Sequence, residues 1–397
     1  MKNILIGLCG FLYAAHAMAI CKINTANELI NLIRNNHPQI KQNNEKIKYS
    51  KYEEEIAATI SNPRLDIEKS FNDTKSTEIA ITQKIELGGK RTNRKDLAKK
   101  HNNLSKFILD IEGQKILIDS ILELHEIQRI SLSLPLYTES LEAFSKIHRA
   151  LNTYKTLSPE KQVEKDTLDL VISDYKFKIA QLQLLQEEKK NHVRISTASN
   201  CSILESSYRV EFDSWPKITE AKTPIENLKL RAAKAQVDVN ELAYELEKSN
   251  SYPDLEIGPK VAIDDNQKSY SLNISFDLPL FDRNSPAKSY QLAKLNAAKK
   301  VKLNIEEQTR LNYQSWISKY KRLKKTLDLI DDHKNFEQKH KRMEKLFKRG
   351  IISTNLVIET HRQLIEFSDT RHDLEHELLE AYLKVAEFNG ELNSIKF

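Results

Sequence analysis

Apolar and polar residues alternate along four short segments of the chain, and this alternation predicts four β-strands. The predicted strands are residues 64–72, 76–87, 254–263 and 269–280. Each is about 9 to 12 residues long, the length that a tilted β-strand needs to cross a bilayer. A soluble sheet with one face packed on helices shows the same alternation, so the pattern alone leaves both structures open.

Long stretches with almost no proline or glycine lie around these strands and predict helices. The predicted helices are residues 25–60, 92–153, 159–193, 225–248, 287–348 and 354–387. In the last two, apolar residues such as Trp316, Tyr320 and Leu323 follow a heptad spacing, which indicates coiled-coil packing. A helix of about 60 residues is roughly 90 Å long, so these helices are expected to form a rod or a tube.

The order of helix, hairpin, long helix and return helix occurs twice along the chain. Pro63 precedes the first strand of one hairpin, and Pro253 precedes that of the other at an offset of 190 residues. We therefore expect two structural repeats, at residues 20–195 and 225–397, joined by a linker or equatorial region at residues 196–224.

Residues 1–19 have the pattern of a secretory signal peptide: Lys2, a short apolar run, and small residues at Ala17 and Ala19. The apolar run falls short of the roughly 20 residues that a transmembrane helix requires. We expect cleavage before Ile20. Cys21 then lies next to the new terminus, where a lipoprotein would be acylated, although Ile20 stands where a lipoprotein signal carries Gly or Ala.

Composition favours long helices and disfavours glycine-rich folds. The 397 residues include only 8 glycines, about 2%, against roughly 7% in an average protein, so Rossmann and P-loop folds are disfavoured. The net charge of +6 is a small difference between 62 basic and 56 acidic residues that are interspersed along the chain. Because no concentrated basic patch is present, we expect no nucleic-acid partner, and no cofactor is indicated.

One short motif resembles an enzyme signature. His372, Glu375 and His376 match the His-x-x-Glu-His pattern of some zinc peptidases. However, Leu374 lies on the predicted coiled-coil seam, and no third ligand can be argued from this stretch. We interpret the motif as a helix face and predict a protein that is not an enzyme, with no catalytic residues and no metal site.

Five short motifs stand at the predicted turns and strand ends. They are Asn62-Pro63-Arg64-Leu65, Ile85-Glu86-Leu87-Gly88-Gly89-Lys90-Arg91, Tyr252-Pro253-Asp254-Leu255-Glu256-Ile257-Gly258, Leu278-Pro279-Leu280-Phe281-Asp282-Arg283-Asn284 and Arg349-Gly350-Ile351-Ile352-Ser353. Together they resemble the TolC-like outer membrane efflux proteins, and the Glu-Leu-Gly-Gly-Lys-Arg run is most similar to the CzcC-like heavy-metal branch. The resemblance covers nearly all of the mature chain.

This resemblance implies a mostly α-helical fold with β-strands, in which a duplicated helix, β-hairpin and long helical hairpin unit is repeated. It implies a homotrimer with a 12-stranded β-barrel among outer membrane lipid, continued by a periplasmic α-helical coiled-coil barrel. The expected partners are a periplasmic membrane fusion adaptor and an inner-membrane RND pump of a Gram-negative bacterium. The expected function is passive conduction, of heavy-metal cations or alternatively of drugs or type I secreted proteins. A periplasmic coiled-coil scaffold without a pore is the non-channel alternative.

The resemblance also implies that the helical turns at the periplasmic tip dock the partner. The residues concerned are Ser158, Gly350, Ile351, Ile352 and Ser353. Leu356 stands where the family motif has an aspartate, and Glu359 one turn further could form an acidic constriction. In the family architecture Cys21 and Cys201 both lie near the equator of the tunnel, and an oxidising periplasm favours a disulfide between them. The sequence leaves open whether Cys21 is disulfide-bonded, free or acylated.

Four strands cannot close even the smallest membrane barrel, which has eight, so several chains must share one. If the apolar face of the strands meets lipid, the polar face lines the lumen. The charged residues expected there are Asp66, Glu68, Glu78, Glu86, Asp254, Glu256, Lys260 and Asp277, together with Arg64 and Lys84. Seven acids and three bases give −4 per chain, which predicts a preference for cations.

Overall fold

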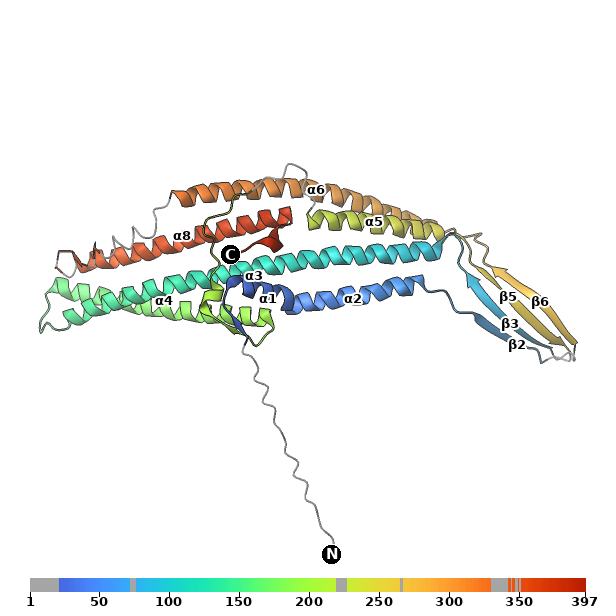
Figure 1. Cartoon of the computed structure of the whole chain (residues 1–397), viewed down its shortest axis with the longest axis horizontal. Coiled ribbons are helices and arrows are strands. Elements are labelled where there is room, and N and C mark those ends of the chain that lie inside the picture. Colours follow the sequence, from blue (N-terminus) through green and yellow to red (C-terminus); the bar gives the residue numbers. More distant parts are fainter. Residues whose placement is uncertain are drawn as a thin grey trace, which may run out of the picture.

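The chain is described by a computed structural model that covers residues 21–71, 76–218, 227–264, 267–329, 342–343, 345–346, 349 and 351–397. The predicted signal peptide at residues 1–19 lies outside the described residues. In Figure 1 the molecule is one elongated layer of helices with a β-sheet at one end. The mostly helical, duplicated fold expected from the sequence is confirmed.

Each repeat contributes helices on both sides of a β-hairpin. The first consists of α1 (Ala26–Asn36), α2 (Pro38–Ala58), β2 (Arg64–Lys69), β3 (Ser76–Ile85), α3 (Lys90–Leu151) and α4 (Pro159–Thr197). The second consists of α5 (Leu228–Ser249), β5 (Leu255–Asp264), β6 (Gln267–Phe276), α6 (Ser285–Asp328) and α8 (Thr354–Asn389). Two 3₁₀ turns, η1 (Glu205–Tyr208) and η2 (Leu392–Ser394), and two short strands described below are the other elements of the described residues.

The predicted helix over residues 25–60 is in fact two helices, which is a correction. The break falls at His37, because the residue before a proline disfavours helical geometry and Pro38 lacks a backbone N–H. Pro38 instead takes the first position of α2, where no N–H is needed. The backbone N–H of Gln39 donates to the ring Nδ1 of His37 at 3.2 Å, which caps the new helix.

The elements lie side by side in a fixed lateral order. The sheet runs β2, β3, β5, β6 with every pair antiparallel. Between the sheet and the middle of the molecule the helices follow the order α2, α3, α5, α6, and toward the opposite tip the order α4, α3, α8, α6. The layer therefore has two lateral edges, one formed by β2, α2 and α4 and the other by β6 and α6.

The largest apolar core lies at the equator of the layer, where α1, α3, α8 and the chain around residues 201–215 meet. Leu29, Ile121, Leu124 and Leu383 are almost fully buried there. The last residue, Phe397, packs its ring 4.9 Å from that of Phe212. The side chain of Asn27 binds the backbone of Phe397 through both its oxygen and its nitrogen. The C-terminus is thus fixed to α1.

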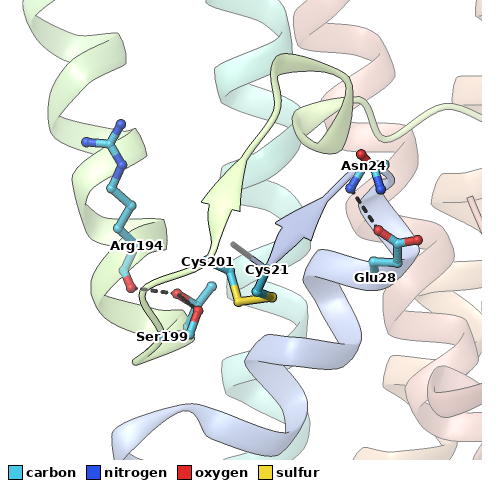
Figure 2. The surroundings of a disulfide bond; sticks show 7 residues. Cys21, Asn24, Glu28, Arg194, Ser199 and Cys201 are labelled. Atoms are coloured by element: carbon cyan, nitrogen blue, oxygen red, sulfur yellow. Dashed lines mark hydrogen bonds between the residues drawn. A yellow bond between two sulfur atoms is a disulfide. The ribbon is translucent and has the colours of Figure 1, made fainter. Parts of the chain in front are cut away.

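A small two-stranded sheet and a disulfide join the start of the chain to the end of the first repeat. Strand β1 (Lys22–Ile23) pairs in parallel with β4 (Ser202–Ile203). Beside this pair the structure joins Cys21 to Cys201, with the two Cα atoms 4.6 Å apart, as Figure 2 shows. The two cysteines are separated by 180 positions in the sequence. No short periodic signal predicts a two-residue parallel strand.

Across the described residues, no helix combines the length and the hydrophobicity that crossing a bilayer requires.

Candidate functional site

The sheet presents one face of apolar side chains to the outside. The register places Leu65 beside Ile81, Ile79 beside Val261, and Ile257 beside Ile274 on the same face. These are joined by Leu255, Ile263, Tyr270, Leu272 and Phe276. Tyr270 is 77% exposed and Ile67 is 65% exposed, because no helix or second sheet covers them in the described part of the chain. A continuous apolar face of this size needs an apolar environment or another protein.

The opposite face of the sheet is polar. Arg64, Asp66 and Glu68 on β2 share it with Glu78 and Lys84 on β3, and with Glu256, Lys260 and Asp264 on β5. Strand β6 adds uncharged serine and asparagine residues. Glu78 forms an ion pair with Lys260 on the neighbouring strand, and Arg64 forms one with Asp66 at 2.8 Å.

The position of three expected lumen residues differs from the sequence-based expectation. Glu86, Asp254 and Asp277 lie beyond the strand ends. Asp264, which the sequence analysis did not include, shares the polar face with Glu256. The charged residues on this face within the described strands are therefore five acids and three bases, a net −2 per chain in place of −4. Lys69 and Lys268 lie on the apolar face.

Glu86 and Asp254 instead form ion pairs where the sheet meets the helices. The Nζ of Lys90 donates to Asp254 at 2.6 Å, and Lys84 pairs with the second oxygen of Asp254 at 2.9 Å. Arg94 holds both oxygens of Glu86, at 2.6 and 3.1 Å. Arg94 also donates to the carbonyl of Ala57 at 2.8 Å, so it ties β3 and α3 to the end of α2.

The glycines of the same motif turn the chain from β3 into α3. Gly88 and Gly89 have φ angles of 69° and 76°, values that residues with a side chain rarely adopt. A Cβ on Gly88 would lie 2.5 Å from the ring of Tyr252, so the turn and the aromatic ring leave no room for one. The Glu-Leu-Gly-Gly-Lys-Arg motif is thus explained in this structure as the joint between the sheet and the helices.

A groove of about 1220 Å³ lies at the tip opposite the sheet, between the end of α3 and the first turns of α4 and α8. Its lining includes Ile147, Leu151, Ile351, Ile352 and Thr354. Ile352 packs on the core around Phe144, whereas Ile351 is 63% exposed. Charged side chains such as Glu142 and Lys146 line the groove beside these apolar ones, and an exposed isoleucine in such a mixed groove favours protein binding.

Ser158 and Ser353 both cap helices at this tip. The hydroxyl of Ser158 accepts from the backbone N–H of Lys161 at 3.3 Å, and that of Ser353 accepts from Leu356 at 3.4 Å. Their presence in the turn motifs is therefore accounted for by helix initiation. Gly350 lies outside the described residues.

Glu359 does not stand as an isolated charge. Both of its carboxylate oxygens accept from Arg362, at 2.7 and 2.9 Å, and Gln363 donates to it at 2.8 Å. The hydrogen bonds from Arg362 and Gln363 lower the pKa of this exposed carboxyl. The neighbouring guanidinium weakens the field that Glu359 could exert at a constriction.

The histidines of the His-x-x-Glu-His motif form contacts within the helical layer. His376 meets His125 of α3 with their Nδ1 atoms 3.3 Å apart, and His372 lies 3.3 Å from Glu375. His125 is buried, and burial followed by the nearby His376 lowers its pKa to about 4. Within the described residues, no group of three or more His, Cys, Asp or Glu side chains is arranged to hold a metal ion. The motif's histidines are thus part of the contact between α3 and α8.

Solved structures of outer membrane proteins share this arrangement of helices and strands. The open-state outer membrane channel MtrE of Neisseria gonorrhoeae aligns with a TM-score of 0.74 at 10% identity, over 93% of this chain and 90% of that one. The outer membrane channel CmeC of Campylobacter jejuni aligns with a TM-score of 0.69 at 10% identity, over 92% and 86%. The outer membrane protein VceC of Vibrio cholerae aligns with a TM-score of 0.67 at 12% identity, over 92% and 96%.

By sequence, no protein-family model and no curated protein matches the chain. At identities near 10%, the structural similarity establishes the fold, and the chain therefore has the fold of the TolC-like outer membrane channels.

Proposed function

We propose that this chain is the outer membrane channel of a tripartite efflux system of a Gram-negative bacterium. The observation that carries the proposal is the four-stranded sheet at the end of the helical layer. Its apolar face is exposed, its other face is polar, and both of its edges are open. Lipid on the apolar face and water on the polar face satisfy both surfaces, as in a membrane barrel. A periplasmic scaffold would leave the apolar face in water.

The open edges explain why several copies are needed. Strands β2 and β6 each have one side with no partner strand in the described sheet. Backbone groups that stay unpaired in lipid cost several kcal/mol each, so β6 of one copy must pair with β2 of the next. Two copies would supply eight strands and three would supply twelve. We propose three, following the resemblance to the TolC-like family.

The tip groove supports docking of a periplasmic adaptor protein, through which an inner-membrane RND pump delivers the cargo. The exposed Ile351 and the apolar part of the groove's lining supply a surface that a helical partner can cover. The net negative charge of the sheet's polar face favours cations as cargo, and we propose metal cations, in line with the CzcC-like character of the Glu-Leu-Gly-Gly-Lys-Arg motif. The pump supplies the energy, and the channel conducts passively.

Fractionation and conductance test this function. The protein, expressed with its leader, should appear in the outer membrane fraction as an oligomer that heating dissociates on gels. Purified in detergent and added to a planar bilayer, it should produce discrete conductance steps. A monomer recovered from the soluble periplasmic fraction, with no conductance, would contradict the proposal.

A further inference from the structure

Two lysines stand on the apolar face of the sheet, the face that the proposed function turns toward lipid. Lys69 is the last residue of β2, and Lys268 is the second residue of β6. They share this face with Leu65, Ile67 and Tyr270, because alternate residues of a strand point to the same side. Both lysines are exposed, and within the described strands they are the only charged residues on this face. We call them the rim lysines.

The register places the rim lysines in one row across the sheet. Lys69 lies opposite Thr77 of β3, and Thr77 lies opposite Ile263 of β5. Ile263 in turn lies opposite Lys268. Three spacings between strands therefore separate the two lysines, about 14 Å in all. The row lies beside the hairpin ends, at the end of the sheet farthest from the helices (Figure 1).

This position corresponds to the boundary of an apolar layer. On β6, Phe276 is the last residue of the strand and follows Lys268 by eight positions. Eight positions span about 26 Å along a strand, or about 20 Å of depth at the tilt of about 40° that membrane strands have. The apolar band of a membrane barrel is about 25 Å tall, so with Phe276 at one boundary the rim lysines lie close to the other. Their flexible side chains can reach the headgroups from there.

An exposed aromatic residue accompanies each rim lysine on the same face. Phe71 follows Lys69 by two positions, and the centre of its ring lies 5.6 Å from the lysine Nζ. Tyr270 follows Lys268 by two positions. Phe71 is 84% exposed and Tyr270 is 77% exposed. Aromatic residues gather where the apolar band of a membrane barrel meets water, so both rim lysines have the surroundings of such a boundary.

The rim lysines differ from the lysines of the polar face in their charge partners. On the polar face, Lys84 pairs with Asp254 at 2.9 Å, and Lys260 forms an ion pair with Glu78. Among the described residues, neither rim lysine lies within ion-pair distance of a carboxylate. A cation beside an apolar layer is costly unless an anion is near. An anion supplied by the membrane would meet this requirement.

A bilayer carries anions at this depth in its headgroups, chiefly as phosphate. The ammonium group of lysine is a compact charge with three donors, which suits phosphate oxygens. Because about 14 Å separates the rim lysines, each meets a headgroup of its own. In the proposed orientation the helices extend into the periplasm, so the hairpin ends of the sheet lie in the outer leaflet.

We propose that the rim lysines bind the phosphate groups of lipids in the outer leaflet, and that the copies of the chain together form a ring of lipid contacts around the outer end of the barrel. This inference rests on the proposed function, because a sheet embedded in a membrane presents these lysines to lipid. It adds a ligand class, a phosphate-bearing lipid, and the two residues that bind it.

A lipid titration tests the contact. The full-length oligomer in a neutral detergent is titrated with phosphatidylglycerol, whose phosphate is not balanced by a cation, and native mass spectrometry counts the lipids bound. Lys69→Gln combined with Lys268→Gln should raise the half-saturating lipid concentration about fivefold, the contribution of one lysine near an anionic lipid surface. Lys69→Arg combined with Lys268→Arg should keep the binding. Phosphatidylcholine, whose phosphate is balanced by its own cation, should bind more weakly than phosphatidylglycerol.

The matched control removes the same charge elsewhere. Lys176→Gln on α4 combined with Lys300→Gln on α6 replaces two exposed lysines outside the sheet, and it should bind phosphatidylglycerol as the unsubstituted protein does. Inorganic phosphate is added as a competitor. At the concentration of the lipid it should displace none, because a free ion lacks the acyl chains that lie on the apolar face of the sheet.

The outcomes separate this inference from the function on which it rests. The oligomeric state and conductance of the unsubstituted protein are measured in the same preparation. If that protein assembles and conducts but the glutamine variant of the rim lysines binds phosphatidylglycerol no more weakly than the control variant, the inference is overturned and the channel function stands. Displacement of the lipid by inorganic phosphate would also overturn it, since the site would then bind a free anion. If the unsubstituted protein neither assembles nor conducts, both are overturned.

Discussion

At the scale of single residues, His125 makes the stability of the protein depend on pH. Its ring is buried against His376, with His372 and Glu375 of α8 and Glu126 of α3 as the other titratable groups nearby. Burial is the largest cause that lowers its pKa to about 4, against 6.5 in the unfolded chain. Below pH 6.5 the unfolded chain therefore binds a proton that the folded protein does not, and stability falls until about pH 4.

We expect this residue to cost about 2 kcal/mol of folding free energy between pH 7 and pH 5. Thermal unfolding of the protein at the two pH values should show the loss, and His125→Asn should reduce it. His101, for which no such burial is seen, provides the control as His101→Asn. An equal drop in the melting temperature of His125→Asn and the unsubstituted protein would contradict the assignment.

Gly258 is a second position at which a single added atom should change the stability of the protein. It stands on β5 opposite β3, and a Cβ there would lie 1.8 Å from the carbonyl oxygen of Ile81. Backbone must move to admit it, so Gly258→Ala should destabilise the sheet by about 1–3 kcal/mol. Gly113→Ala is the matched control: no atom lies within 4 Å of its added Cβ, and in the middle of α3 alanine should stabilise by about 1 kcal/mol. The temperature at which the oligomer dissociates on gels compares the two, and equal behaviour would argue against the close approach.

At the scale of elements, the disulfide ties β1 and β4 together across the first repeat. We expect no free thiol when the mature protein is unfolded without reductant and titrated. Closing a loop of 180 residues corresponds to about 5 kcal/mol in the entropy model, so Cys201→Ser paired with Cys21→Ser should lower the melting temperature clearly. Finding two free thiols in the unreduced protein would refute the bond.

The tip groove is the element that the proposed adaptor contacts. Ile351→Asp places a charge on its exposed rim, and because Ile351 contributes little to the packed core, assembly should survive. Export by cells should be lost while the oligomer and its conductance remain. Ile108→Asp, at a position on α3 away from the groove that is 44% exposed, should export normally. Unchanged export by Ile351→Asp would count against docking here.

Most of what the sequence could predict about these elements came from the periodic spacing of apolar residues. Alternation along β5 and β6 predicts which residues share a face, because each side chain points opposite to the one before it. The same rule misplaced Glu86: it has the parity of Lys84, but the strand has already ended and Arg94 holds its carboxylate. The contact of His125 with His376 had no sequence signal either, since 251 positions separate the two. Such contacts arise from packing between helices, which local patterns do not encode.

At the scale of the whole molecule, the charge on the polar face of the sheet predicts how the proposed channel conducts. The described strands give −2 per chain, so the proposed barrel of three chains would carry −6. Acidic linings favour cations, and salt screens charges more than about 10 Å apart at 0.1 M. Selectivity should therefore be modest, and stronger in dilute salt. A single-sided KCl gradient across a planar bilayer should give a reversal potential of cation-selective sign.

The faces of the sheet can be tested with the same measurement. Neutralising Glu256 and Asp264 as Glu256→Gln and Asp264→Asn should move the reversal potential toward zero, since both lie on the polar face. Lys268→Gln should leave it unchanged, because Lys268 lies on the apolar face. An anion-selective channel, or an effect of Lys268→Gln equal to that of the acid variants, would show that the faces are reversed.

The bond between Cys21 and Cys201 also bears on the order in which the molecule is made. Cys201 lies near the midpoint of the 397-residue chain, and the bond encloses α1 through α4 together with the first hairpin. If the chain is exported from its N-terminus, as proposed, this covalent loop can close while the second repeat is still crossing the inner membrane. The first repeat is then a covalently closed unit before the second repeat is complete. The second repeat then folds against the first, through the contacts of α5 and α8 with α3. Folding of the duplicated chain is thereby divided into two shorter steps.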